Sequence, residues 1–248
     1  MSEKIEYKGY KIVITQDEDA PNPREEWDNL GVMVTAHSRY TLGDVQIGTR
    51  QTKKLQPWSF PDVEEFDRFI KQQKKCVVLP LYMYDHSGIT IRTSSAMFRA
   101  IDHAGWDWGL LGYIFATGNM IKKEFGVKVI TDEVIENAKK ILTSEVEIYD
   151  DYVNGNVYCF DIYAPPPGYE YDKDYNSFIN EDGEEFVGYW DDSVDSIGGI
   201  FGYSECVTDA KAMVDWHIAD TAKKEAERVQ KIETNHVLLF EKLEAVGL

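Results

Sequence analysis

Histidine is the side chain best suited to proton transfer near neutral pH, and this chain has only five. Three of them lie in polar segments close to an aspartate, and together these side chains would suit a divalent metal that activates water. The candidate metal ligands are His37, Asp44, Asp85, His86 and His103. Their spacing lacks the His-x-x-x-His pair with an intervening Glu that marks a helical zinc site. A metal-dependent enzyme is therefore an alternative interpretation.

Other signatures of catalysis are missing from the sequence. It contains no Gly-x-Ser-x-Gly turn for a serine nucleophile and no glycine-rich loop followed by Lys-Ser or Lys-Thr for a phosphate. Its three cysteines are Cys76, Cys159 and Cys206, an odd and widely spaced set that fits a reducing compartment better than a disulfide framework. We expect no cofactor, and the sequence favours a binding protein over an enzyme.

The distribution of charge is the most unusual property of the chain. Its 248 residues include 26 basic and 44 acidic side chains, for a net charge of −18. Residues 145–209 hold seventeen of the acids and one base, Lys173. An excess of negative charge this large repels nucleic acids and anionic membranes, so we expect no direct binding to either.

The acidic stretch is also rich in aromatic residues. Acidic tails that stay disordered are poor in aromatics, so this stretch is expected to fold and to bring like charges together. A basic partner protein would compensate that repulsion. The predicted contact residues are acids from this stretch: Asp150, Asp151, Asp172, Asp174, Glu181, Asp182, Glu184, Glu185, Asp191 and Asp192.

The hydrophobic pattern predicts an α+β fold: an antiparallel, hairpin-rich sheet with two short helices and a long C-terminal helix. The helices are expected near 60–74 and from Thr131 to about Leu142. Strands are expected at 5–16, 32–36, 76–84, 89–93, 106–116, 146–152, 157–163, 177–179 and 185–189. The turns between them include Asn154-Gly155 and Asp182-Gly183, both typical of hairpins.

The last segment predicts one helix from Thr208 to about Val246. Apolar residues recur along it at alternating steps of three and four, as in a coiled-coil seam. The seam residues are Val229, Ile232, His236, Leu239, Leu243 and Val246. The helix either packs on its own domain or pairs with a second copy of the chain. The predicted domains are an α+β body at 1–206 and this helix at 207–248.

The longest apolar run, Leu110 to Ala116, is far shorter than the ~20 residues that a membrane helix needs. The first residues are polar and predict no secretory signal. A cytoplasmic protein is therefore expected.

Several strings of the sequence resemble a family of uncharacterised proteins encoded by bacteriophages, over about residues 5–205. The strings are residues 23–31 (PREEWDNLG), 37–44 (HSRYTLGD), 81–88 (LYMYDHSG), 106–114 (WDWGLLGYI), 149–158 (YDDYVNGNVY) and 199–203 (GIFGY). This chain has two glutamates before Trp27 where the family has one. The resemblance implies a phage accessory protein acting in the host cell, and it implies no catalytic residues.

Charge and resemblance together predict an acidic inhibitor of a host defence protein. The protein would occupy a basic nucleic-acid-binding groove of its target. It would do so either because its negative field imitates the phosphate backbone or because its bulk blocks the groove. Duplex DNA carries one charge per ~1.7 Å, so a net −16 on one face would match roughly eight base pairs. The alternatives are the metal-dependent enzyme and an oligomerising scaffold built on the last helix.

Overall fold

The computed structural model describes residues 2–48, 60–166, 168–172, 174, 177–186 and 193–246, without the side chains of residues 233 and 235–246. The chain forms two compact units. The terminal unit combines Met1–Gln16 with Tyr158–Leu248, and the central unit is Asp17–Val157. This division differs from the predicted one at residue 206, because the last helix packs on the N-terminal strands and shares their core.

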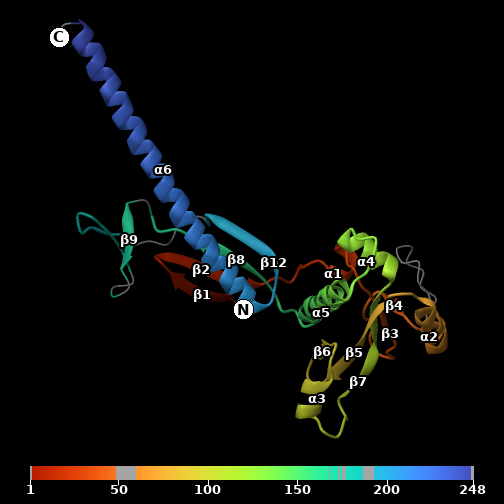
Figure 1. Cartoon of the computed structure of the whole chain (residues 1–248). Helices are drawn as coiled ribbons and strands as arrows, with labels where there is room; N and C mark the ends of the chain where they lie inside the picture. Colours follow the sequence, from red (N-terminus) through yellow and green to blue (C-terminus); the bar gives the residue numbers. More distant parts are fainter. Residues whose placement is uncertain are drawn as a thin grey trace. The chain divides into compact units, whose positions relative to one another are not determined.

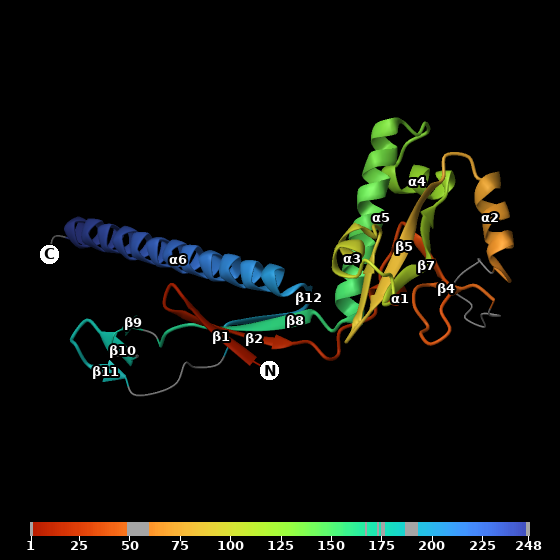
Figure 2. The same cartoon turned by 90° about the horizontal axis from the view of Figure 1, so that it is seen from below.

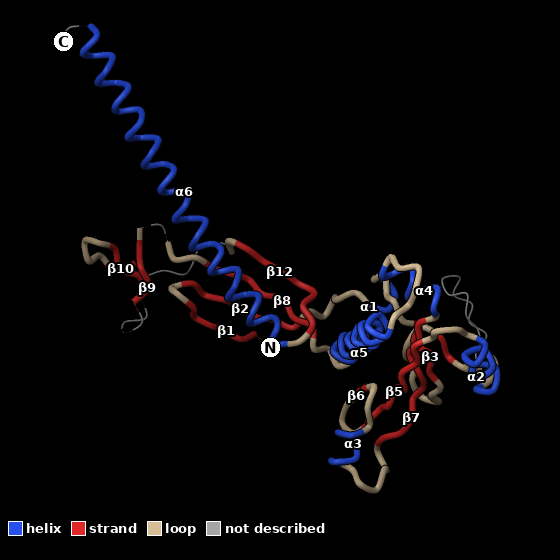
Figure 3. Tube along the Cα trace, viewed as in Figure 1, coloured by secondary structure: helices blue, strands red, loops and turns tan. Residues whose placement is uncertain are grey.

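The central unit is built on a five-stranded sheet with the order β4-β3-β7-β5-β6 (Figures 1 and 3). Its strands are β3 (Val32–Thr35), β4 (Val45–Gln46), β5 (Val77–Asp85), β6 (Ile89–Arg92) and β7 (Trp108–Ala116). The middle strand β7 runs antiparallel to β3 and β5. In β5, Pro80 pairs with Tyr113 of β7. The pairing of β5 with β6 begins at Tyr82, and the register of β5 against β7 shifts between Leu81 and Tyr82, as at a bulge.

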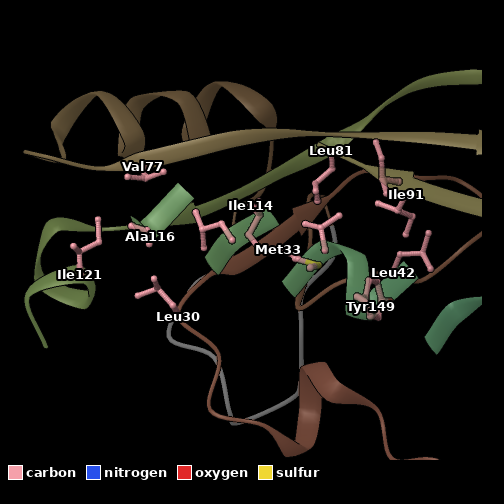
Figure 4. Close-up of a cluster of buried hydrophobic side chains, with 14 of the residues drawn as sticks. Leu30, Met33, Leu42, Val77, Leu81, Ile91, Ile114, Ala116, Ile121 and Tyr149 are labelled. Atoms are coloured by element: carbon pink, nitrogen blue, oxygen red, sulfur yellow. The ribbon is translucent and has the colours of Figure 1, made fainter. Parts of the chain in front are cut away.

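A hydrophobic core lies on each face of this sheet, and β7 contributes to both because successive residues of a strand point in opposite directions. Ile114 packs in the core beneath α5 (Asp132–Val153), together with Met33, Leu81 and Tyr149 (Figure 4). Phe115 joins the second core, formed with Phe66 of α2 (Val63–Gln72). Figure 2 shows α5 and α2 on opposite sides of the sheet.

The predicted strand at 146–152 is wrong, because α5 continues through it to Val153. Leu142, Val146 and Tyr149 follow at helical spacing and are buried against the sheet. The Asn154-Gly155 pair marks the end of this helix, with Gly155 at φ +67°, and is not a hairpin turn. The predicted start is confirmed, since the Thr131 hydroxyl accepts a hydrogen bond from the Val134 amide.

Short helices fill the connections of the central unit. They are α1 (Pro23–Glu26), α3 (Ala96–Ile101) and α4 (Gly118–Phe125). Together with the mainly antiparallel strands, these helices confirm the predicted α+β class.

The terminal unit has a four-stranded sheet with the order β1-β2-β8-β12. Its strands are β1 (Ser2–Tyr7), β2 (Tyr10–Gln16), β8 (Val157–Tyr163) and β12 (Asp195–Phe201). The helix α6 (Tyr203–Val246) packs on it through Cys206, Ala210 and Val214, which recur every four residues. It therefore begins before Thr208, since Cys206 already belongs to its buried stripe.

Most of α6 extends beyond this contact. Its 44 residues span about 66 Å at 1.5 Å per residue, and residues 221–232 are all exposed. Val229 and Ile232 of the predicted seam are 46% and 49% exposed. The side chains of His236, Leu239, Leu243 and Val246 lie outside the described part. None of the helices in the described ranges is long and apolar enough to cross a bilayer.

A small separate sheet carries much of the acidic stretch, and we call it the acidic sheet. It consists of β9 (Tyr169–Asp172), β10 (Ser177–Asn180) and β11 (Glu185–Phe186), in the antiparallel order β11-β10-β9. The predicted hairpin around Asp182-Gly183 is confirmed, with Gly183 at φ +79°.

Arg24 ties the central unit together from within. Its side chain is 3% exposed, and it donates to Asp44 Oδ1 at 3.0 Å, to Glu145 Oε2 at 2.9 Å and to the Gly31 carbonyl at 2.6 Å. These bonds join α1, the β3–β4 connection and α5. Burial raises the pKa of the Glu145 carboxyl, and the facing guanidinium opposes that shift. The two carboxylates would be left without their cation if Arg24 were removed.

We expect Arg24→Ala to lower the free energy of unfolding by about 3–5 kcal/mol, because it leaves two buried carboxylates without their cation. Urea unfolding followed by circular dichroism measures this loss. The matched control is Arg68→Ala, which breaks an exposed pair with Glu65 and should cost less than about 1 kcal/mol. Equal losses in the two variants would contradict the structural role given to Arg24.

Candidate functional site

The structure brings three of the five candidate metal ligands to one end of the central sheet. His37 follows β3, and Asp85 and His86 form the turn between β5 and β6. Asp44 lies elsewhere: Arg24 and the Met33 amide occupy its carboxylate. The His103 Nδ1 lies against the Arg99 carbonyl. Among the residues described, no group of three or more His, Cys, Asp or Glu side chains is placed to hold a metal, so the predicted metal set is wrong as a single site.

The charged side chains at this end of the sheet pair with one another. Arg39 Nη2 donates to Asp85 Oδ2 at 2.6 Å, and His86 Nδ1 lies 3.0 Å from Asp107 Oδ2. Tyr40 stacks on the His37 ring at a centroid distance of 5.0 Å. The result is a mixed polar and aromatic surface without a free ligand set for a cation.

The loop that leads into β7 is organised by Asp102. Its carboxylate accepts hydrogen bonds from the amides of Ala104 and Gly105 through one oxygen and from that of Asp107 through the other. Its carbonyl accepts from the Trp108 indole at 2.9 Å. The hydrogen bond from the Asp107 amide, with those from the other loop amides, lowers the pKa of Asp102.

Two of the ten predicted contact acids belong to the central unit, on α5. Asp150 is 4% exposed, accepts from the Ile91 amide at 2.6 Å and pairs with Arg92. It is an internal counter-ion, so its assignment to a contact face is wrong. Asp151 is partly buried and bonds Asn156, and burial raises its pKa.

The other predicted acids fall in the terminal unit. Asp191 and Asp192 lie outside the described residues. The remaining six belong to the acidic sheet and its turns: Asp172, Asp174, Glu181, Asp182, Glu184 and Glu185. The predicted set of contact acids is therefore reduced to six in the described residues, and these are concentrated on one small sheet.

The strand register gives the acidic sheet two different faces. Ile179 of β10 pairs with Glu170 on one side and with Glu185 on the other. Because residues directly opposite share a face, these two carboxylates flank one isoleucine. Asp172 follows Glu170 by two residues and lies on the same face. Glu170 was absent from the predicted contact set, although its alternation with aromatic neighbours was a usable signal.

The opposite face is aromatic. Phe178, which is 2% exposed, pairs with Tyr171 and Phe186, and its ring centroid lies 5.5 Å from that of Tyr171. The Tyr171 hydroxyl donates to Glu6 at 2.7 Å, which ties β9 to β1. Burial and this carboxylate raise the pKa of Tyr171 to about 12. Phe178 is buried on the aromatic face, whereas Glu170 and Glu185 on the acidic face are exposed.

The turn between β10 and β11 is held by Asn180. Its side-chain oxygen accepts from the amides of Asp182 at 3.1 Å and Glu184 at 2.7 Å, and its amide group donates to the Glu184 carboxylate. A groove of about 840 Å³ runs along this turn and β9, and Glu170, Asp172, Glu181 and Asp182 contribute to its lining.

Comparison with protein-family models, curated proteins and solved structures found no match to this chain. The candidate sites are therefore assigned from their own geometry.

The order of the Asp102 loop is expected to depend on pH. A carboxyl whose pKa is lowered on folding stabilises the folded loop fully above its ordinary value of 3.8, and this contribution is lost as the pH falls through the lower folded-state value. The Trp106 indole N–H resonance, followed by NMR during acidification, reports the change.

The matched control is Asp102→Asn, whose side chain cannot titrate. Its Trp106 resonance should already be shifted at neutral pH and should not show the acidic transition. The same transition in both proteins would mean that Asp102 does not order this loop.

Proposed function

We propose that this chain is an acidic binding protein that docks the acidic sheet into a basic, nucleic-acid-binding groove of a partner protein. The observation that supports this most is the row of Glu170, Ile179 and Glu185, with Asp172 on the same face. Seven acids and one base lie within residues 168–186. Like charges gathered on one face of a small sheet repel one another, and a basic partner would compensate that repulsion.

The geometry limits how much of a groove the acidic sheet occupies. A net charge of −6 corresponds to ~10 Å of duplex at one charge per ~1.7 Å, or about three base pairs. This is less than the eight base pairs expected from the whole acidic stretch. The sheet therefore competes for a local phosphate-binding patch and does not imitate a long duplex.

The sequence is the basis for the proposed partner and for the proposed compartment. The resemblance to bacteriophage-encoded proteins favours a host defence protein, such as a nuclease, as the owner of the basic groove. The protein would then act in the host cytoplasm, with no direct contact to nucleic acid or membrane. Electrostatic steering would make the association fast and sensitive to salt.

The test neutralises the acidic face in the full chain. The variant Glu170→Gln, Glu181→Gln, Asp182→Asn and Glu185→Gln changes four exposed side chains. We expect the wild-type protein to displace duplex DNA from a purified basic host nuclease at low salt, and the variant to do so about tenfold less well or worse. Fluorescence anisotropy of labelled DNA across a salt series measures the displacement.

The matched control removes the same charge from the central unit. It carries Glu64→Gln, Asp67→Asn, Glu124→Gln and Glu133→Gln, all at exposed positions. Equal losses in the two variants would show a general charge effect. Displacement that does not change with salt would contradict electrostatic docking.

We further propose that α6 joins two copies of the chain through its exposed outer part. Val229 and Ile232 are about half exposed on the described part of this helix, which is longer than the sheet contact requires. Like-facing apolar residues at a and d positions are buried when two such helices pair. A dimer would present two acidic sheets to the partner.

The variant Val229→Asp with Ile232→Asp is expected to reduce the mass of the full chain to that of a monomer. Light scattering coupled to size exclusion measures it. Gln230→Asp is the control on the same helix, because it adds charge away from the seam. A wild-type protein that is already monomeric would remove the proposal of a helix pair.

A further inference from the structure

Three segments that are distant in sequence meet at one end of the central sheet. They are the loop after β3, the β5–β6 turn and the loop between α3 and β7 (Figures 1 and 3). Between them is a pocket of about 240 Å³, which we call the tip pocket. It is lined by His37, Arg39, Met83, Asp85, Trp106, Asp107, Trp108, Gly109 and Leu110.

Trp106 is presented to solvent by a well-ordered loop. It is 87% exposed, while the residues on both sides of it are fixed by hydrogen bonds to Asp102. An exposed indole costs free energy in water, and most loops avoid that cost by turning the ring inward. A loop that holds its tryptophan outward, beside a pocket, is typical of a preformed binding surface.

The charges of the pocket argue against an ionic ligand. Arg39 is its one Arg or Lys lining side chain and is paired with Asp85 at 2.6 Å. Asp107 is paired with His86 at 3.0 Å. Among the described lining residues, the one Arg or Lys side chain is already paired, and two carboxylates together with a net chain charge of −18 repel a phosphate.

The same groups suit a ligand that carries hydroxyls. Arg39 offers several N–H donors in one plane, and Asp85 and Asp107 offer carboxylate acceptors beside it. A hydroxyl group both donates and accepts, so neighbouring hydroxyls can bond to a guanidinium and a carboxylate at once. The face of Trp106 packs against the C–H face of a saturated ring.

We propose that the tip pocket binds one ring of a neutral oligosaccharide, with Trp106 as the platform for that ring or the next. The volume supports a single ring, since it lies below the ~300–1,000 Å³ of pockets that enclose drug-sized ligands. Leu110, 54% exposed, adds an apolar side chain to the lining. This proposal is independent of the acidic sheet and stands if the docking function fails.

The experiment titrates the full chain with three neutral trisaccharides: maltotriose, cellotriose and triacetylchitotriose. Two-dimensional NMR of the tryptophan indole N–H groups reports binding at each tryptophan separately. We expect at least one trisaccharide to shift the Trp106 and Trp108 resonances in a saturable manner at millimolar concentration. Resonances of tryptophans that do not line the pocket, such as Trp216, should stay in place.

Two variants test the assignment of the pocket. Trp106→Ala removes an exposed ring and should raise the dissociation constant at least about tenfold, which is a loss of 1.4 kcal/mol or more of binding free energy. Arg39→Gln should raise the dissociation constant by a similar factor while leaving the fold intact, because the Arg39 side chain is 68% exposed. Trp216→Ala is the matched control, since Trp216 is 56% exposed on α6, and it should bind as the wild type does.

Three results would overturn the proposal. The first is the absence of saturable shifts at Trp106 with all three trisaccharides. The second is tighter binding of adenosine monophosphate than of every trisaccharide at the same resonances, which would assign the pocket to a nucleobase. Equal weakening by Trp216→Ala and Trp106→Ala would also count against it.

Discussion

The structure of this protein depends on one geometric constraint: side chains of a β-strand alternate between two faces. In the central unit, this alternation puts Ile114 under α5 and Phe115 under α2, so one strand supplies two cores. In the acidic sheet it separates Phe178 from Ile179, and with them an aromatic face from an acidic one. Phe178 can therefore be buried while Glu170 and Glu185 stay in water, which lets so acidic a segment fold.

The acidic residues that are crowded together in residues 145–209 divide into two groups in the structure. Glu145 and Asp150 lie inside the central unit, where they neutralise Arg24 and Arg92. Such acids stabilise the fold and contribute nothing to a surface field. By contrast, Glu170 of β9 and the acids of the turn between β10 and β11 are exposed, and they are the ones that a partner would meet. Net charge alone does not separate these two groups.

Local sequence signals predicted much of the fold. The hairpin at Asp85-His86, the cap at Thr131 and the turn at Asp182-Gly183 are set by residues within a few positions of one another. The predictions were wrong where the local structure or the partner of a residue depends on residues far away in the sequence. The strand expected at 146–152 is a helix because Val146 and Tyr149 pack on a sheet formed by residues far away. Asp44 is not available as a metal ligand because its carboxylate pairs with Arg24. That partner lies 20 residues away in the sequence, and no local pattern indicates the pairing.

The central claim is that the partner is bound by the acidic face itself and is not attracted merely by the total charge of the chain. Amide hydrogen exchange of the full chain with and without a purified basic nuclease tests it most directly. We expect slower exchange in β9, in β11 and in the turn at 181–184, and unchanged exchange in the central unit. Protection confined to residues of the central unit, with the acidic sheet exchanging as in the free protein, would contradict the account.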